Sequence, residues 1–150
     1  MAFFINIYNA LIIDATVRLG SPSNLFKRLT FFGDAMYRIG PHTFSANDIE
    51  HGILRNNATS PASVGALVNF DPLKKPQLKQ GDARRQLCVD PIDPRIHFAL
   101  VCGAKSCPPI KMYTPDNLNE GLQVLISILT CRASNVTLST TNCLRCCNAG

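Results

Sequence analysis

The sequence predicts an α+β fold, in which a buried first helix packs on a small antiparallel sheet and further helices complete the domain. Residues 3–19 are apolar almost all round the helical circumference, which is typical of a helix inside a core. Residues 96–102 place apolar side chains on both faces in alternation, which indicates a buried strand. A length of 150 residues suits one domain, and a 46% hydrophobic content against 17% charged residues suffices for a packed core.

The first helix is expected to end at Gly20, which suits the position just after a helix terminus. Asn6 and Asn9 are three residues apart and therefore share a face near the start of this helix. Buried amides need hydrogen-bond partners. The two side chains are therefore expected either to tie neighbouring loops together or to line a pocket.

Residues 23–32 predict a second, short helix, and residues 36–39 predict a strand. The clearest local signal follows, because Ser45 can cap a helix that runs to about Arg55, with Asp48 three residues on as the partner in a capping box. Two apolar residues flank the cap as a hydrophobic staple: Phe44 and Ile49. A polar stripe on this helix is either a surface row of ion pairs or the wall of a pocket: Asp48, His51 and Arg55.

The second half of the chain predicts a β-hairpin and a last helix. Residues 84–89 can form a strand that pairs, through a Pro-rich turn, with residues 96–102. Thr114 is expected to cap the last helix, in which leucines recur at helical spacing. The pattern fails in the Cys-rich tail of residues 131–150, so the domain is expected over residues 3–130.

Charge and composition narrow the expected partners and compartment. The net charge is +5, and five basic residues lie around one long loop. No aromatic residues are interleaved with them, so nucleic acid is not the expected partner. Residues 2–13 are apolar but lack a basic start, and about a dozen residues are fewer than the roughly 20 of a membrane span. Seven cysteines fit either a reducing compartment or a poorly folded tail. We therefore expect a cytoplasmic protein that does not contact a membrane.

Cys107 and His97 are the candidate catalytic pair. A nucleophilic cysteine needs a base or a cation nearby to hold it as a thiolate. Cys107 lies on a loop beside Lys105 and Ser106, where a substrate can reach it, and His97 is the natural base. Four residues are candidates for orienting the imidazole: Asn6, Asn9, Asp48 and His51. In the alternative interpretation His97 is a hydrogen-bonded core histidine and Cys107 a structural thiol, whereas Cys102 packs as a small apolar residue in either case.

Zinc is a second chemical possibility. Cys102, Cys107 and His97 offer three soft ligands, and the tail offers further cysteines. Structural zinc sites usually show paired short Cys or His spacings, and the tail has only a ragged version of this pattern. The chain also lacks a Gly-rich phosphate loop, so we expect no metal and no other cofactor.

Three longer motifs occur in a fixed order: FFINIYNAL at residues 3–11, FSANDIEHGILR at residues 44–55 and DPRIHFALVCGAKSCPP at residues 93–109. Together they resemble the family named domain of unknown function 547, over roughly residues 3–130. The resemblance implies a domain whose relatives carry it beside a glutaredoxin-like domain, as a thiol-redox partner, or beside a leucine-zipper region in plants. It implies no activity.

Carried over by position, the polar residues of the family fall at Asn6, Asn9, Asp48, Glu50, His51, Arg55, Arg95, His97, Cys102, Ser106 and Cys107. The segments that the family has before Phe3 and after the last helix differ here, so we expect a fragment of the family domain. A core helix followed later by a strand that begins with His also resembles papain-type and transglutaminase-type thiol enzymes. There the cysteine stands at the start of the core helix, near the place of Asn6.

We therefore predict an uncharacterised domain with a polar pocket that performs thiol-dependent acyl transfer or hydrolysis on an unknown small molecule or peptide. Cys107 is the expected nucleophile, His97 the base, and His51 or Asn6 the residue that orients the base. Eight further residues are expected to bind the substrate: Asn9, Asp48, Glu50, Arg55, Arg95, Cys102, Lys105 and Ser106. The alternative is a non-catalytic protein-interaction module in which the same residues bind a peptide or hold the fold.

Overall fold

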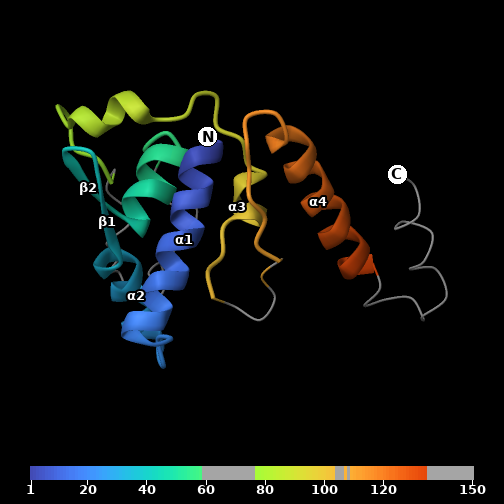
Figure 1. Ribbon diagram of the computed structural model, residues 1–150, viewed down its shortest axis with the longest axis horizontal. Helices are drawn as coiled ribbons and strands as arrows, with labels where there is room; N and C mark the ends of the chain where they lie inside the picture. The colour runs from blue at the N-terminus through green and yellow to red at the C-terminus, as the bar shows by residue number, and fades with distance from the viewer. Residues whose placement is uncertain (59–76, 104–106, 108, 135–150) are drawn as a thin grey trace.

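The computed structural model describes residues 1–58, 77–103, 107 and 109–134. The elements follow one another as α1 (Ala2–Leu19), α2 (Leu25–Asp34), β1 (Met36–Ile39), β2 (His42–Ser45), η1 (Asp48–Leu54), η3 (Ala83–Leu87), α3 (Ile96–Ala99) and α4 (Leu118–Ser134). Helices together with a two-stranded antiparallel sheet confirm the predicted α+β class. In Figure 1, α1 lies in the middle of the molecule, with β1 and β2 on one side and α3 and α4 on the other.

α1 contributes one face to the core, where it packs against η1. The fully buried positions Ile5, Tyr8 and Ile12 recur at intervals of three and four residues, so they share a face. The opposite side reaches solvent, and Val17 is 79% exposed. The sequence had indicated a helix that is buried almost all round. The structure instead buries one face of it. Gly20 ends it with φ of +79° and donates its backbone N–H to the Thr16 carbonyl.

α1 is also apolar enough, over its 18 residues, to cross a membrane by length and composition, with a mean hydropathy of 1.3. Residues 2–13 alone are too short for a span, whereas the whole of α1 is long enough. The structure buries 44% of this helix inside the fold. Core helices of soluble proteins and N-terminal signal sequences share these properties.

The hairpin and the capped helix after it follow from local chemistry. β1 pairs with β2 in a register that sets Met36 opposite Ser45 and Ile39 opposite His42. The predicted capping box is confirmed, because Ser45 N–H donates to Asp48 Oδ2 at 3.0 Å and Asp48 N–H donates to Ser45 Oγ at 3.1 Å. η1 then continues as a π-helix, a rare form with i to i−5 hydrogen bonds that is frequent at functional sites.

The predicted β-hairpin of residues 84–89 and 96–102 is wrong. Residues 83–87 form the 3₁₀-helix η3, and residues 96–99 form the short helix α3. Asp93 holds the turn before α3, because its carboxylate accepts the Arg95 N–H at 2.9 Å and its carbonyl accepts the Ile96 N–H at 3.2 Å. Ile96, Ala99 and Leu100 are buried at helical spacing, so the same apolar run that suggested alternation also satisfies one helical face. The likeness to thiol enzymes had relied on a strand that begins with His97, and that strand is absent.

α4 contacts α3 and completes the core on that side, with Leu122 and Leu125 buried. Thr114 and Asn117 exchange two hydrogen bonds in the turn before the helix, where Thr114 N–H donates to Asn117 Oδ1 at 2.8 Å. The helix continues to Ser134, so it extends into the segment where the apolar pattern of the sequence fails. The lysines of the central loop at positions 74 and 75 lie outside the described residues.

Candidate functional site

Two amides of α1 hold the segment that carries the candidate thiols. Asn9 donates from Nδ2 to the Ala99 carbonyl and accepts the Val101 N–H at Oδ1, both at 2.9 Å. Asn6 forms the same pair of bonds with Tyr113, at 2.7 Å to its carbonyl and 2.9 Å from its N–H. Of the two interpretations of these amides, the structure shows the tie between neighbouring segments. Within the described part of the chain, the Asn6 amide contacts no imidazole.

The thiols of Cys102 and Cys107 lie against each other. Their sulfur atoms are 3.3 Å apart, and the Cys102 backbone N–H donates to Cys107 Sγ at 3.4 Å. Gly103 follows Cys102 with φ of +76°, a conformation that favours glycine, so the chain turns directly after the first thiol. Both side chains are half-buried. The sequence had suggested that Cys102 only packs as a small apolar residue. In the structure its sulfur also contacts the sulfur of Cys107, the candidate nucleophile.

Glu50 of η1 lies between a buried tyrosine and the candidate base. Tyr8, 1% exposed on α1, donates its hydroxyl to Glu50 Oε2 at 2.9 Å. Glu50 Oε1 is 4.0 Å from His97 Nδ1 on α3, within ion-pair reach but longer than a hydrogen bond. Burial raises the pKa of Tyr8 well above its usual value, and the charges of Glu50, Cys102 and Cys107 raise it further. The phenol therefore stays protonated, and both thiols lie within electrostatic reach of it.

His51 is held as a neutral imidazole on the same helix. Arg55 Nη1 lies 2.9 Å from His51 Nδ1, and because a guanidinium can only donate, Nδ1 accepts and the ring proton belongs on Nε2. Burial lowers the pKa of His51; Glu50 opposes this shift, whereas the positive charges of Arg55 and His97 add to it. The predicted histidines His51 and His97 therefore lie close enough to influence each other, and the charge of Glu50 acts on His51 as well.

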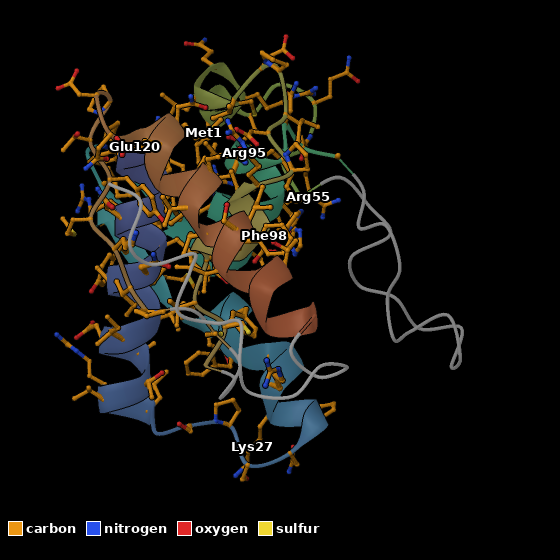
Figure 2. The ribbon with its side chains drawn as sticks, turned by 90° about the vertical axis from the view of Figure 1, so that its right-hand side faces the viewer. Met1, Lys27, Arg55, Arg95, Phe98 and Glu120 are labelled. Atoms are coloured by element: carbon orange, nitrogen blue, oxygen red, sulfur yellow. The ribbon has the colours of Figure 1, made fainter. Side chains whose placement is uncertain are left out.

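Two further predicted charged residues, Asp48 and Arg95, are engaged in ion pairs. Asp48, besides its capping bonds, accepts from Gln77 and from Arg84, each at 3.0 Å. Arg95 pairs with Asp93 at 2.8 Å, and its hydrogen bonds hold the pKa of that carboxyl below its usual value. Figure 2 views the molecule from the side that carries α4 and labels Arg95, Phe98 and Arg55, of which Phe98 is partly exposed and Arg55 is buried. Lys105 and Ser106 lie outside the described residues.

Sequence reasoning missed the pairing of Tyr8 with Glu50. Glu50 entered only through the family resemblance, and Tyr8 was part of an apolar run. A usable signal existed, because a tyrosine in a buried helix needs a partner for its hydroxyl. Among the described residues, no group of three His, Cys, Asp or Glu side chains is placed to hold a metal ion. The proposed zinc ligands Cys102, Cys107 and His97 are therefore not gathered into such a group.

The sequence model of a family described as "Protein of unknown function, DUF547" matches residues 1–126. No curated protein and no solved structure matches the chain.

Proposed function

The chain belongs to the DUF547 family, whose function is unknown, and from the geometry of its site we propose that it catalyses thiol-dependent acyl transfer or hydrolysis. Two observations support this proposal: Glu50 lies between Tyr8 and His97, and the charges of the paired thiols Cys102 and Cys107 reach the same Tyr8. Nucleophilic catalysis by cysteine needs a thiol, a base and a third group that orients the base. Cys107, His97 and Glu50 are groups of these three kinds.

Cys107 acts as the nucleophile. The Cys102 N–H that points at Cys107 Sγ favours the thiolate over the thiol, because hydrogen bonds to a charged form stabilise that form. His97 removes the thiol proton. The thiolate forms a bond to the acyl carbon, the bond from this carbon to the leaving group breaks, and the leaving group takes the proton from His97. Water or another nucleophile then releases the acyl group from sulfur.

Glu50 takes the orienting role that the sequence had given to His51 or Asn6. Its Oε1 faces His97 Nδ1, and an acceptor on that side stabilises the imidazolium that forms when His97 takes a proton. Tyr8 fixes the other carboxylate oxygen, so the carboxylate has a defined direction. The 4.0 Å separation suits a site without substrate, because catalytic hydrogen bonds often shorten only in the complex.

The competing proposal is a non-catalytic interaction module. It is supported by the contacts of Asn6, Asn9, Asp48 and Arg95, which bind other parts of the same chain. We favour the catalytic proposal because those contacts explain these four residues but do not explain the pairing of Glu50 with Tyr8 and its approach to His97. We further propose the cytoplasm as its compartment, since a reducing environment keeps a nucleophilic thiol available.

Acetylation of the full chain by p-nitrophenyl acetate at neutral pH, mapped by peptide mass spectrometry, tests the proposal. We expect acetyl transfer to Cys107, slowed about 100-fold in His97→Gln because a general base contributes roughly 10²–10⁴-fold. Glu50→Gln should slow it less, because Glu50 acts through His97. Cys88→Ser is the matched control: that thiol donates to the Gly52 carbonyl, burial raises its pKa, and its loss should leave the rate unchanged. Acetylation of Cys107 no faster than that of Cys88 would favour the interaction module.

A further inference from the structure

We infer that Cys102 and Cys107 form a redox-active dithiol, which a small disulfide such as glutathione disulfide converts to an intramolecular disulfide. The inference rests on the contact between the two thiols and does not depend on the proposed acyl transfer. Their sulfur atoms are already 3.3 Å apart, so a bond of about 2.05 Å requires the thiols to approach by little more than 1 Å. The contact therefore places two reactive groups at one point.

The surroundings of the pair favour exchange. Both thiols are half-buried, so they are held in place and still reach solvent. The backbone N–H of Cys102 supports negative charge on Cys107 Sγ, and the thiolate is the form that attacks a disulfide. Asn9 anchors Val101, the residue before Cys102, to α1 through a buried amide. One partner is thus fixed to the core, while Gly103 provides the turn directly after it.

Cys88 is a useful comparison, because its sulfur donates to a backbone carbonyl instead of contacting a second thiol. It is also half-buried, but it donates to the Gly52 carbonyl, and burial raises its pKa. A protonated thiol that is engaged as a donor is a poor nucleophile. We therefore expect the Cys102–Cys107 pair to react before Cys88 does.

The exchange balances in two steps. The Cys107 thiolate attacks one sulfur of glutathione disulfide, forms a mixed disulfide and releases one glutathione. The Cys102 thiolate then attacks Cys107 Sγ, closes the Cys102–Cys107 bond and releases the second glutathione. The two thiols lose two electrons and two protons, which leave with the two glutathione thiols. If the proposed acyl transfer is correct, oxidation also removes the nucleophile and switches that activity off reversibly.

Glutathione exchange on the full chain, with acid quenching, alkylation and peptide mass spectrometry, tests the inference. We expect a Cys102–Cys107 cross-link in the wild type. In Cys102→Ser the mixed disulfide should persist on Cys107, at a level at least about tenfold above that in the wild type, because no resolving thiol remains. Cys88→Ser should form the cross-link as the wild type does.

A stable mixed disulfide on Cys107 in the wild type, or a cross-link from Cys107 to a tail cysteine, would overturn the inference. Acetylation of the reduced wild type by p-nitrophenyl acetate is measured in parallel. It separates the two proposals, since a chain that is acetylated at Cys107 but forms no Cys102–Cys107 bond retains the proposed activity and refutes only the dithiol.

Discussion

His51 shows how one residue sets the response of the fold to pH. Burial lowers its pKa, Glu50 opposes the shift, and Arg55 and His97 add to it. In the unfolded chain the His51 imidazole is protonated near pH 6.5, whereas in the folded protein it is protonated only at a lower pH. The unfolded state therefore binds more protons in that window, and the free energy of unfolding falls as the pH drops below 6.5.

We expect His51→Gln to be less sensitive to mild acid than the wild type. Urea denaturation at about pH 7.5 and 5.5 measures the loss of unfolding free energy between the two values, and the loss should be smaller in the variant because the titrating group is gone. Asp82 does not interfere, because hydrogen bonds from Arg84 lower its pKa to about 2, and its contribution is lost only in stronger acid. Equal losses in the two proteins would contradict a lowered His51 pKa.

The sequence predicted single residues well where their partners are close along the chain. The Ser45–Asp48 capping box joins residues three positions apart, so its chemistry is visible in the sequence. The bond from Tyr8 to Glu50 spans 42 positions, and the bond from Asn9 to Ala99 spans 90. Such partners are chosen by tertiary packing, which spacing rules do not contain. The sequence therefore named Glu50, His51 and His97 as candidates, but it did not name Tyr8 and it did not predict which residues pair.

At the scale of elements, the π-helix η1 decides which way its polar side chains face. The Arg55 N–H donates to the Glu50 carbonyl and the Asn57 N–H to the Gly52 carbonyl, each across five residues. Glu50 then meets Tyr8 and His97, while the adjacent His51 meets Arg55. The sequence predicted a helix here and its start correctly. It did not predict the π-helical form, because that form depends on tertiary packing and not on neighbouring residues.

Close packing of η1 makes Gly52 a sensitive position. A Cβ at Gly52 would lie 3.0 Å from Cγ of Leu78, a side chain that is 1% exposed. Leu78 cannot retreat easily, because Asn57 binds both its N–H and its carbonyl at 2.8 Å. We expect Gly52→Ala to destabilise the fold by about 1 kcal/mol net, since overpacking costs roughly 1–3 kcal/mol and the gain in helix propensity offsets part of it.

Gly33→Ala is the matched control for this substitution in urea denaturation. Gly33 lies in α2, and the nearest side-chain atom to its added Cβ would be 3.8 Å away, an ordinary contact. This variant should therefore be stabilised, by up to about 1 kcal/mol from helix propensity. A Gly52→Ala protein as stable as Gly33→Ala would show that Leu78 moves aside without cost.

For the whole molecule, α1 is the element to which distant parts of the chain are joined. Its buried face packs on η1, and its amides bind residues 99–101 and Tyr113. The segment with both thiols runs between these two anchor points. The predicted α+β class is correct, but the sheet lies at β1 and β2 and not at residues 84–102. α1 and α4 have strong apolar patterns, whereas α3 and η3 are short helices whose apolar residues fit a strand equally well.

Asn9→Ala tests this role of α1. Asn9 is 2% exposed, and its loss leaves the Val101 N–H and the Ala99 carbonyl without their side-chain partner. We expect the free energy of unfolding to fall by about 2–3 kcal/mol, because each buried polar group left unpaired costs roughly 1–3 kcal/mol. Hydrogen exchange at the Val101 amide should also accelerate, which reports the local release of the thiol segment from α1.

Asn117→Ala provides the comparison. Its side-chain amide accepts the Thr114 N–H and donates to the Met112 carbonyl in an exposed turn before α4, so its loss should cost about 1 kcal/mol or less and leave exchange at Val101 unchanged. If α1 does not anchor the thiol segment, Asn9→Ala will be no more destabilising than Asn117→Ala, and the Val101 amide will exchange equally in both. If it does, the loss of one amide 90 positions away along the chain will release the residues that lead to Cys102.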